Sequence, residues 1–296
     1  MKRKRLWKGL VLALALLVLG SLVLGAAGYA MLFAGRVETP ENRRYALSDF
    51  PGLEAEAVAF SNNRGEPLAG WLYSYGDAEP AGLVVMVHGM GNGHLAYLNV
   101  AAAFARAGWL VFAYDATGND ASGGSERRGI PQAVLDLDAA LKTAEALPQT
   151  QGLPVCLFGH SLGAHTVCAA LADHPEVRAA AALSGFDGTA AYIRETYGVP
   201  GLILLPGALF WERLRFGGAA GRTALDGFAA SEARVLIVHG TADETVPIAS
   251  GLERYEAVWG GDPRFTFLRI NGAGHGGVFT RQVREACLEL FREACQ

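Results

Sequence analysis

Short apolar runs alternate with helix-like segments along most of this 296-residue chain, and this order constrains the fold more than any other feature. The runs are six to eight residues long, rich in β-branched and aromatic side chains, and typical of buried strands. Strands that alternate with helices form parallel β-α-β units. The sequence therefore predicts an α/β fold, with a mainly parallel sheet and helices on both faces. The clearest strands are expected at 83–89, 109–115, 154–159, 233–240 and 264–271.

One interval lacks a strand. Between Asp187 and Ser231 the chain contains a strongly apolar stretch at 199–211. We expect a helical cap insertion at about 188–231 over the strand ends, since long insertions between elements are usually functional. Additional core-packing helices are the alternative. The apolar stretch is too short, and too interrupted by prolines, to cross a membrane.

The N-terminus differs from the rest of the chain. Residues 1–8 form a basic tail with five positive charges, and residues 9–35 are all uncharged. As a helix, 27 residues would span about 40 Å, enough to cross a hydrocarbon core of about 30 Å. We expect a transmembrane signal anchor at 9–35 and a linker at 36–53. A cleaved signal peptide is the alternative, because small residues at 26–30 would allow cleavage.

Charge distribution gives an orientation and excludes one class of partner. The basic flank predicts that the N-terminus stays in the cytoplasm and the catalytic domain lies outside. Beyond residue 36 the chain holds 19 basic and 29 acidic residues, a net charge of −10 that does not favour nucleic-acid binding. The four cysteines fit neither a disulfide framework nor a zinc motif, and we expect them to be small buried hydrophobic residues.

The pentapeptide Gly-His-Ser-Leu-Gly at 159–163 places Ser161 between an expected strand and an expected helix. Glycine is so abundant here that such a pattern would arise roughly 0.16 times by chance, so the context decides its meaning. A tight strand-to-helix turn would lift the Ser161 hydroxyl out of the sheet as a nucleophile. The alternative is that Ser161 only caps the following helix.

A serine nucleophile needs a base and an acid that orients the base. His275 follows the last expected strand in a glycine-rich loop, and Asp243 follows the strand before it. The three residues occur in the order Ser, Asp, His, each at the C-terminal end of a strand. We expect them to form a catalytic triad, with Asp187 as the reserve acid.

The glycine-rich loop after the strand at 83–89 suits an oxyanion hole. We expect the backbone N–H groups of Met90 and Leu162 to hold the oxyanion. His94 and Tyr97 are weaker candidates for contacting substrate at the entrance. Asp115 is expected to fix its own loop, and no spacing of histidines predicts a metal site.

With these motifs the chain resembles the α/β-hydrolase superfamily, and within it the serine aminopeptidase and monoacylglycerol-lipase-like branch with its membrane-anchored bacterial members. The resemblance runs from about Glu54 to the C-terminus. It depends on HGMG, YDATGNDASGGS, GHSLGA, HGTADETVP and GAGHGG, where Asn119-Asp120 replaces the commoner Gly-His. The resemblance implies an α/β-hydrolase domain at 54–296 that hydrolyses an ester, thioester or amide through an acyl-serine intermediate.

The expected activity is that of a cofactor-free serine hydrolase that cleaves a carboxylic ester. The apolar cap and the membrane anchor favour a lipophilic acyl ester or a lysophospholipid. A peptidase or acyltransferase with the same triad is the first alternative. A non-catalytic, membrane-tethered binding module is the second, although no triad member is missing. The sequence predicts no oligomeric state.

Overall fold

The computed structural model describes residues 2–76 and 78–296, so Met1 of the predicted tail and Asp77 in the loop before β3 lie outside the described residues. One eight-stranded sheet has the order β1-β2-β4-β3-β5-β6-β7-β8. β2 is antiparallel to β1 and β4, and the strands from β4 across to β8 run parallel. The strands are β1 (Leu53–Ser61), β2 (Pro67–Tyr75), β3 (Leu83–Val87), β4 (Leu110–Tyr114), β5 (Val155–His160), β6 (Val177–Leu183), β7 (Arg234–Gly240) and β8 (Phe265–Ile270).

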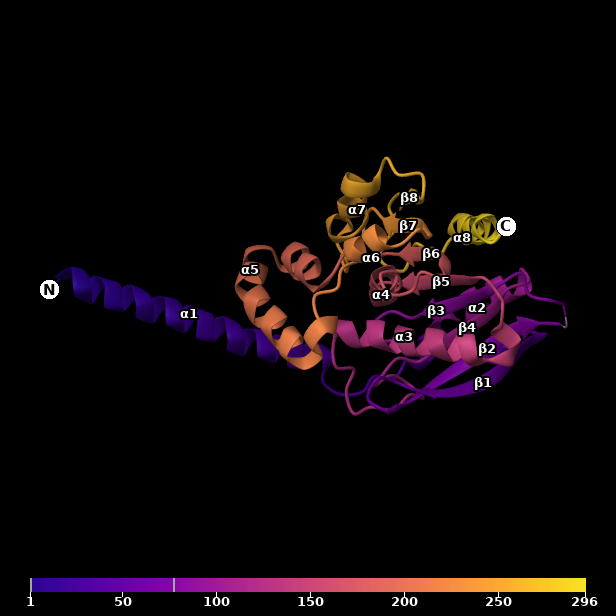
Figure 1. Cartoon of the computed structure of the whole chain (residues 1–296), viewed down its shortest axis with the longest axis horizontal. Helices are drawn as coiled ribbons and strands as arrows, with labels where there is room; N and C mark the ends of the chain where they lie inside the picture. The colour runs from indigo at the N-terminus through magenta and orange to yellow at the C-terminus, as the bar shows by residue number, and fades with distance from the viewer. Residues whose placement is uncertain (1, 77) are drawn as a thin grey trace.

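Helices cover both faces of this sheet (Figure 1). Side chains along β3 alternate between two apolar clusters, with Val85 facing α3 and α4 and Met86 facing α2 and α8. Burial on both faces explains why the central strands are continuous apolar runs, and it confirms the predicted mainly parallel α/β fold. The helices are α1 (Lys2–Phe33), α2 (Leu98–Arg106), α3 (Ile130–Ala146), α4 (Leu162–Ala170), α5 (Thr189–Phe216), α6 (Ala224–Ala230), α7 (Leu252–Trp259) and α8 (Arg281–Ala294).

The strandless interval contains two helices with different surroundings. α6 packs against α4, and its Phe228 is buried in the sheet-side core. That part of the interval matches the alternative of a core-packing helix. α5 kinks at Gly198 and packs chiefly against α1, away from the sheet. The part of the interval that lies outside the two sheet-covering layers is therefore α5.

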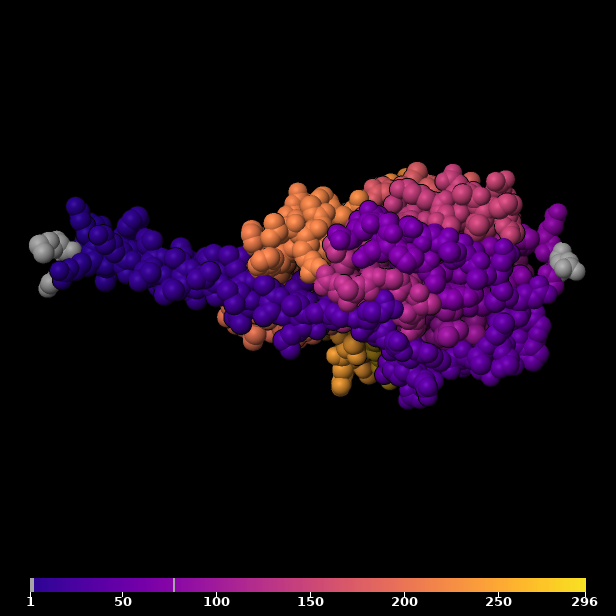
Figure 2. All heavy atoms as spheres, turned by 90° about the horizontal axis from the view of Figure 1, so that it is seen from below, coloured from indigo at the N-terminus to yellow at the C-terminus, as the bar shows by residue number. Residues whose placement is uncertain are grey.

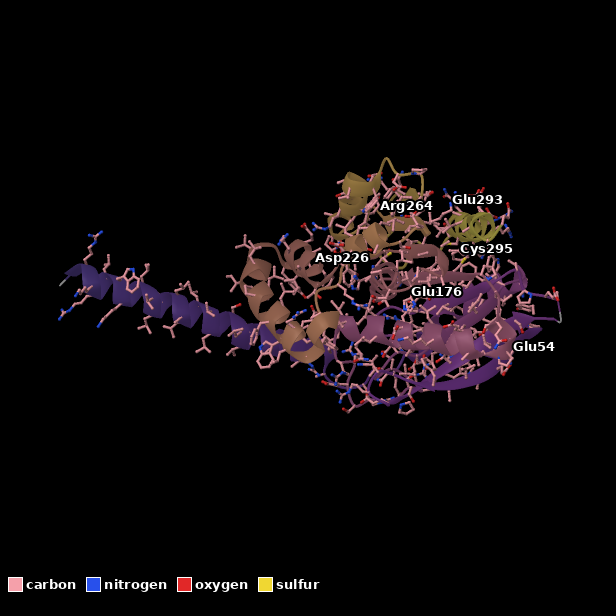
Figure 3. The ribbon with its side chains drawn as sticks, viewed as in Figure 1. Glu54, Glu176, Asp226, Arg264, Glu293 and Cys295 are labelled. Carbon is pink, nitrogen blue, oxygen red and sulfur yellow. The ribbon has the colours of Figure 1, made fainter. Side chains whose placement is uncertain are left out.

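The N-terminal helix α1 projects from the domain as a long rod (Figure 1). Residues 3–19 are exposed throughout, and Figure 3 shows side chains projecting from this part of the rod on several sides. By length and composition, residues 3–33 are a candidate membrane span. The segment after α1 is attached to the domain, because Val37 N–H donates to Gly118 O at 2.9 Å and Asp120 N–H donates to Val37 O at 3.0 Å.

All four cysteines are free. Cys156, Cys168 and Cys287 are buried, as expected for small hydrophobic residues, whereas Cys295 just after α8 is half-buried (labelled in Figure 3). The Sγ atoms of Cys156 and Cys295 lie 3.6 Å apart, a neighbourhood that spacing along the chain does not reveal.

Candidate active site

Ser161 occupies the sharp turn between β5 and α4. Its φ of 56° and ψ of −119° lie in a region that only glycine adopts readily, which costs about 1–3 kcal/mol. A Cβ atom on Gly159 would collide with the Gly163 carbonyl, and one on Gly163 would collide with the Val87 carbonyl. The two glycines are therefore required by close backbone approach. The Ser161 side chain makes no cap hydrogen bond to α4, in contrast to the helix-cap alternative.

His275 and Asp243 meet at the ends of β8 and β7. His275 Nδ1 lies 2.8 Å from Asp243 Oδ2, and a ring nitrogen facing a carboxylate carries the proton. The other carboxylate oxygen, Oδ1, accepts the N–H groups of Thr245 and Val246, both at 2.9 Å. The Asp243 side chain is fully buried, while that of His275 is 20% exposed. This leaves His275 Nε2 available for proton transfer.

The electrostatics of this pair favour an ionised carboxylate. Burial raises the pKa of Asp243, but hydrogen bonds from His239, His275 and the Val246 N–H lower this pKa by more. The net pKa of Asp243 is therefore below its ordinary value. His239 Nε2 is 3.4 Å from Asp243 Oδ2 and 3.0 Å from Val246 O, so its proton is directed mainly at the carbonyl. The charged carboxylate can therefore stabilise a protonated His275.

A cavity of about 500 Å³ brings these groups together. Ser161, His275, Met90 and Leu162 all line it. Neither the Met90 nor the Leu162 N–H donates to another residue in the described part of the chain, so both are available to a ligand oxygen. In the part of the chain that the structure describes, no hydrogen bond joins Ser161 Oγ to His275. Such a catalytic hydrogen bond commonly tightens only when substrate is bound.

Tyr97 and His160 link the three loops that surround the cavity. Tyr97 OH accepts the Gly89 N–H at 3.0 Å and lies 2.9 Å from His160 Nδ1, to which it donates. His160 Nε2–H then donates to the His275 carbonyl at 3.0 Å. Burial lowers the pKa of His160 to about 4, with proximity to His275 adding to the effect, so the ring is neutral at pH 7. A neutral His160 ring can accept at Nδ1 and donate at Nε2, as these two contacts require.

The two candidate entrance residues have different positions. Tyr97 lines the cavity, although its hydroxyl is occupied by the loop contacts above. His94 does not line it: its ring stacks on Trp71 with centroids 3.8 Å apart, and its Nδ1 lies 2.8 Å from Asp115 Oδ1. His94 is a buried partner of Asp115, which fixes the loop after β4 as expected.

Asp187 does not reach His275. Its Oδ1 accepts the Leu225 N–H at 3.0 Å, and its Oδ2 accepts Arg254 Nε–H at 2.9 Å. Both oxygens are directed at the α6 and α7 side of the domain. The geometry therefore places Asp243, and not the reserve acid, beside the histidine.

Part of the cavity wall comes from elements that the motifs do not indicate. Tyr29, Leu32 and Phe33 from the end of α1 line the cavity together with Tyr192 and Ile193 from α5. The apolar pattern at 9–35 predicts a membrane anchor or a cleaved signal peptide, and it predicts no contact with the cavity. A helix that is apolar all round gives no periodic signal for the face that contacts the domain.

Two arginines also line the cavity. Arg43 and Arg127 form no ion pair with any carboxylate of the described residues. The Arg127 N–H donates to Phe33 O at 3.1 Å, and its guanidinium donates to Leu32 O. Positive charge is therefore available beside a space that apolar side chains also line. In the described chain, no group of three or more His, Cys, Asp or Glu side chains is placed to hold a metal ion.

Sequence comparison matches residues 78–201 to the model of a family described as serine aminopeptidase, S33. That stretch includes Ser161, Met90 and Leu162 but ends before Asp243 and His275. The chain is also 36% identical over 111 residues to a monoacylglycerol lipase from Mycolicibacterium smegmatis. The match covers 37% of this chain and 39% of that relative, so the similarity spans well under half the length of either protein.

Solved structures resemble the chain over a longer stretch. An esterase from Pyrococcus furiosus superposes with a TM-score of 0.67 at 19% identity, over 89% of this chain and 98% of the esterase. A hypothetical protein from Pseudomonas aeruginosa gives a TM-score of 0.62 at 18% identity, over 84% of this chain and 96% of its own. At these identities the likeness establishes the fold alone.

Proposed function

We propose that this chain, which has the fold of the α/β-hydrolase superfamily, is a serine hydrolase that cleaves a carboxylic ester with Ser161, His275 and Asp243. The observation that carries the proposal is the 2.8 Å contact between Asp243 and His275, because His275 lines the same cavity as a serine held in a strained turn. An acid, a base and a nucleophile with these surroundings are the parts that acyl transfer needs.

The first half-reaction forms an acyl-serine. Ser161 Oγ attacks the ester carbonyl carbon while its proton passes to His275 Nε2. Asp243 holds the Nδ1–H and stabilises the imidazolium. The carbonyl oxygen becomes negative and accepts the Met90 and Leu162 N–H groups, the second of which lies at the N-terminus of α4. The bond to the leaving alcohol then breaks, and the alcohol oxygen takes the proton from Nε2.

The second half-reaction repeats these steps with water. Water attacks the acyl carbon and gives a proton to His275 Nε2, which returns it to Ser161 Oγ as the acid leaves. Each oxyanion-hole donor is typically worth about 2.7–4 kcal/mol in the transition state. Two available amides are therefore a large part of the expected rate enhancement.

A serine-reactive probe tests this assignment. We expect Ser161→Ala to abolish labelling by a fluorophosphonate and to lower ester hydrolysis by roughly 10⁴-fold or more, because no nucleophile remains. Ser125→Ala changes an exposed serine and should label like the wild type. Undiminished labelling of a folded Ser161→Ala protein would defeat the assignment.

We propose a lipophilic acyl ester with an anionic head group, such as a lysophospholipid, as the substrate class. Apolar side chains of Phe186, Ile130 and Val246 line the cavity and suit an acyl chain, while Arg43 and Arg127 suit a phosphate. A chain-length series of p-nitrophenyl esters, run beside lysophospholipids and monoacylglycerols, tests both parts. A preference for acetyl esters would remove the acyl-chain part, and a preference for monoacylglycerol would remove the phosphate part.

A peptidase is the second candidate, because the matching family is described as a serine aminopeptidase. The same triad also serves acyl transfer to an acceptor other than water. Product analysis with aminoacyl amides, and with added alcohol acceptors, separates these activities from ester hydrolysis. Release of free amine from the amides at rates above ester hydrolysis would favour the peptidase.

We further propose that α1 is an uncleaved membrane anchor with the catalytic domain outside the cytoplasm. The basic residues before the apolar stretch support this orientation. Alkaline phosphatase fused to the C-terminus should then be active in cells, since this reporter folds only outside the cytoplasm. An inactive fusion, with a cytoplasmic reporter active at the same position, would reverse the orientation.

A further inference from the structure

We propose that the end of α1 forms part of the substrate-binding site, so that Tyr29, Leu32 and Phe33 determine which acyl chains the enzyme accepts. This inference rests on the proposed hydrolase function and deepens it. It assigns to the N-terminal helix a role in specificity beyond anchoring.

The first support is a buried stripe along α1. Ser21, Gly25, Tyr29 and Phe33 are buried although the rest of the helix is mostly exposed. Their spacing of four residues places them on one helix face. This face lies against α5, and Figure 2 shows the end of the indigo helix side by side with the orange segment. Contact along a single face is typical of specific helix packing.

The second support is the closeness of this contact. A Cβ atom on Gly25 would collide with the backbone of Gly207, and one on Gly207 would collide with the Ser21 carbonyl. Ser21 Oγ donates to Ile203 O at 2.7 Å and accepts the Gly207 N–H at 3.2 Å. Its hydroxyl thus bridges the carbonyl and amide that are four residues apart along α5. Small residues and a serine are what allow helices to approach closely in an apolar medium.

A buried polar contact fixes the same interface nearer the domain. Tyr29 OH donates to Glu212 Oε1 at 2.9 Å, and Thr189 Oγ1 donates to the same oxygen at 2.8 Å. Glu212 is only 1% exposed. Glu212 therefore links Tyr29 of α1 to Thr189 at the other end of α5. Without α1, the buried Glu212 carboxylate would lose the hydrogen bond from Tyr29.

These contacts bring the last turns of α1 to the cavity that contains Ser161. Tyr29 and Phe33 belong to an apolar cluster with Ile130, Phe186 and Val246. All five side chains line the cavity. An acyl chain bound to Ser161 would therefore contact residues supplied by the N-terminal helix. Cleavage at 26–30, the signal-peptide alternative, would remove Tyr29 or its connection to the rest of α1.

The decisive experiment compares two glycine substitutions in α1 of the full-length protein in detergent micelles. Gly25→Leu should unseat α1 from α5, and the ratio of kcat/KM for decanoyl to that for acetyl p-nitrophenyl esters should fall roughly tenfold or more. Gly20→Leu adds the same side chain at a position where a Cβ would have no atom of the described chain within 4 Å. It should keep the wild-type ratio. Equal ratios in both variants would overturn the proposal.

A second variant covers the possibility that Gly25→Leu does not fold. Phe33→Ala shortens the wall and leaves the Gly25–Gly207 approach and the Tyr29–Glu212 hydrogen bond in place, and it should lower the same ratio through loss of apolar contact with the acyl chain. An unchanged ratio in Phe33→Ala would also overturn the proposal. Failure of the proposed function would look different, because neither wild type nor variants would then hydrolyse any ester or label with a fluorophosphonate.

The mass of the membrane-bound enzyme gives an independent test. The proposal expects an active chain that retains residues 21–33. An active enzyme whose intact mass shows cleavage before Phe33 would contradict it, whatever the behaviour of the variants.

Discussion

At the scale of single residues, Tyr97 connects groups that are distant in sequence. Its hydroxyl joins the Gly89 N–H of the oxyanion loop to His160, which in turn contacts the His275 carbonyl. The backbone positions of Met90, Ser161 and His275 thus depend on one chain of hydrogen bonds. We regard Tyr97 as a positioning residue, because it acts through the loops and not on the reacting atoms.

Replacing this hydroxyl should affect turnover more than binding. We expect Tyr97→Phe to lower kcat by roughly ten- to a hundredfold with little change in KM, since misplacing an oxyanion donor weakens only transition-state contacts. Steady-state kinetics measure the split. Tyr114→Phe is the matched control, because the buried Tyr114 hydroxyl has no hydrogen-bond partner among the residues that the structure describes and should be dispensable. A rise in KM alone would assign Tyr97 to substrate binding.

Motifs predicted the residues that we propose to perform the chemistry, but not those that position them. Ser161, Asp243 and His275 follow strand ends, and parallel strands bring such positions to one edge of the sheet. The contact between Tyr97 and His160 depends on how α2 and β5 pack, which no local pattern encodes. His94 illustrates the same limit: it neighbours the glycine-rich loop in sequence, yet its ring turns to Asp115 and Trp71.

At the scale of elements, the segment after α1 is held by an aspartate in the loop after β4. Asp120 Oδ1 accepts the Thr39 N–H at 2.7 Å, and its Oδ2 accepts the Thr39 hydroxyl at 2.6 Å. Arg44 adds a contact at 3.3 Å. The departure of this loop from the commoner Gly-His pattern therefore has a structural explanation, because Asp120 docks the predicted linker onto the domain.

Removing this carboxylate should release the segment. We expect Asp120→Ala to lower the free energy of unfolding by about 2 kcal/mol and to speed tryptic cleavage after Arg43 and Arg44. Limited proteolysis followed by mass spectrometry measures the cleavage rate. Glu38→Ala serves as control, because the Glu38 side chain is 79% exposed and its ion pair with Arg44 is long, at 3.8 Å. Equal cleavage rates in the two variants would show that Asp120 does not hold the segment.

The sequence predicted the elements of the sheet well and the surroundings of α1 poorly. Apolar runs and glycine-ended helices mark the α/β core because their periodicity reflects burial. In α1 every position from 9 to 35 is uncharged, so the stripe through Ser21 and Gly25 is hidden within uniform hydrophobicity. The two helices of the interval 188–231 were also not distinguishable by pattern, although only α6 joins the core.

At the scale of the whole molecule, two buried histidines should make the fold sensitive to acid. Burial lowers the pKa of His160 and of His165 to about 4, from an ordinary value of 6.5. Between these values the unfolded chain binds more protons than the folded chain, so stability increases with pH across this window. The contribution is complete above about pH 6.5 and is lost as the pH falls toward 4.

Thermal unfolding of the detergent-solubilised protein tests this dependence. Each histidine should account for up to about 3 kcal/mol between pH 6.5 and pH 4. His165→Gln cannot be protonated in this range and should show a smaller loss of Tm on acidification than the wild type. A Tm that is independent of pH between 7 and 4.5 would contradict the prediction.

The packing of α5 against α1 has a consequence for how substrate would reach the cavity. Val199, Leu202, Ile203, Phe210 and Leu214 of α5 expose apolar side chains beside α1. With α1 inserted in a bilayer, these side chains would enter the lipid, and the cavity would lie at the lipid surface. Substrate would then arrive by lateral diffusion, and turnover would follow its mole fraction among the surrounding lipids. Diluting it with inert lipid would slow the enzyme, whereas diluting the whole suspension with buffer would not.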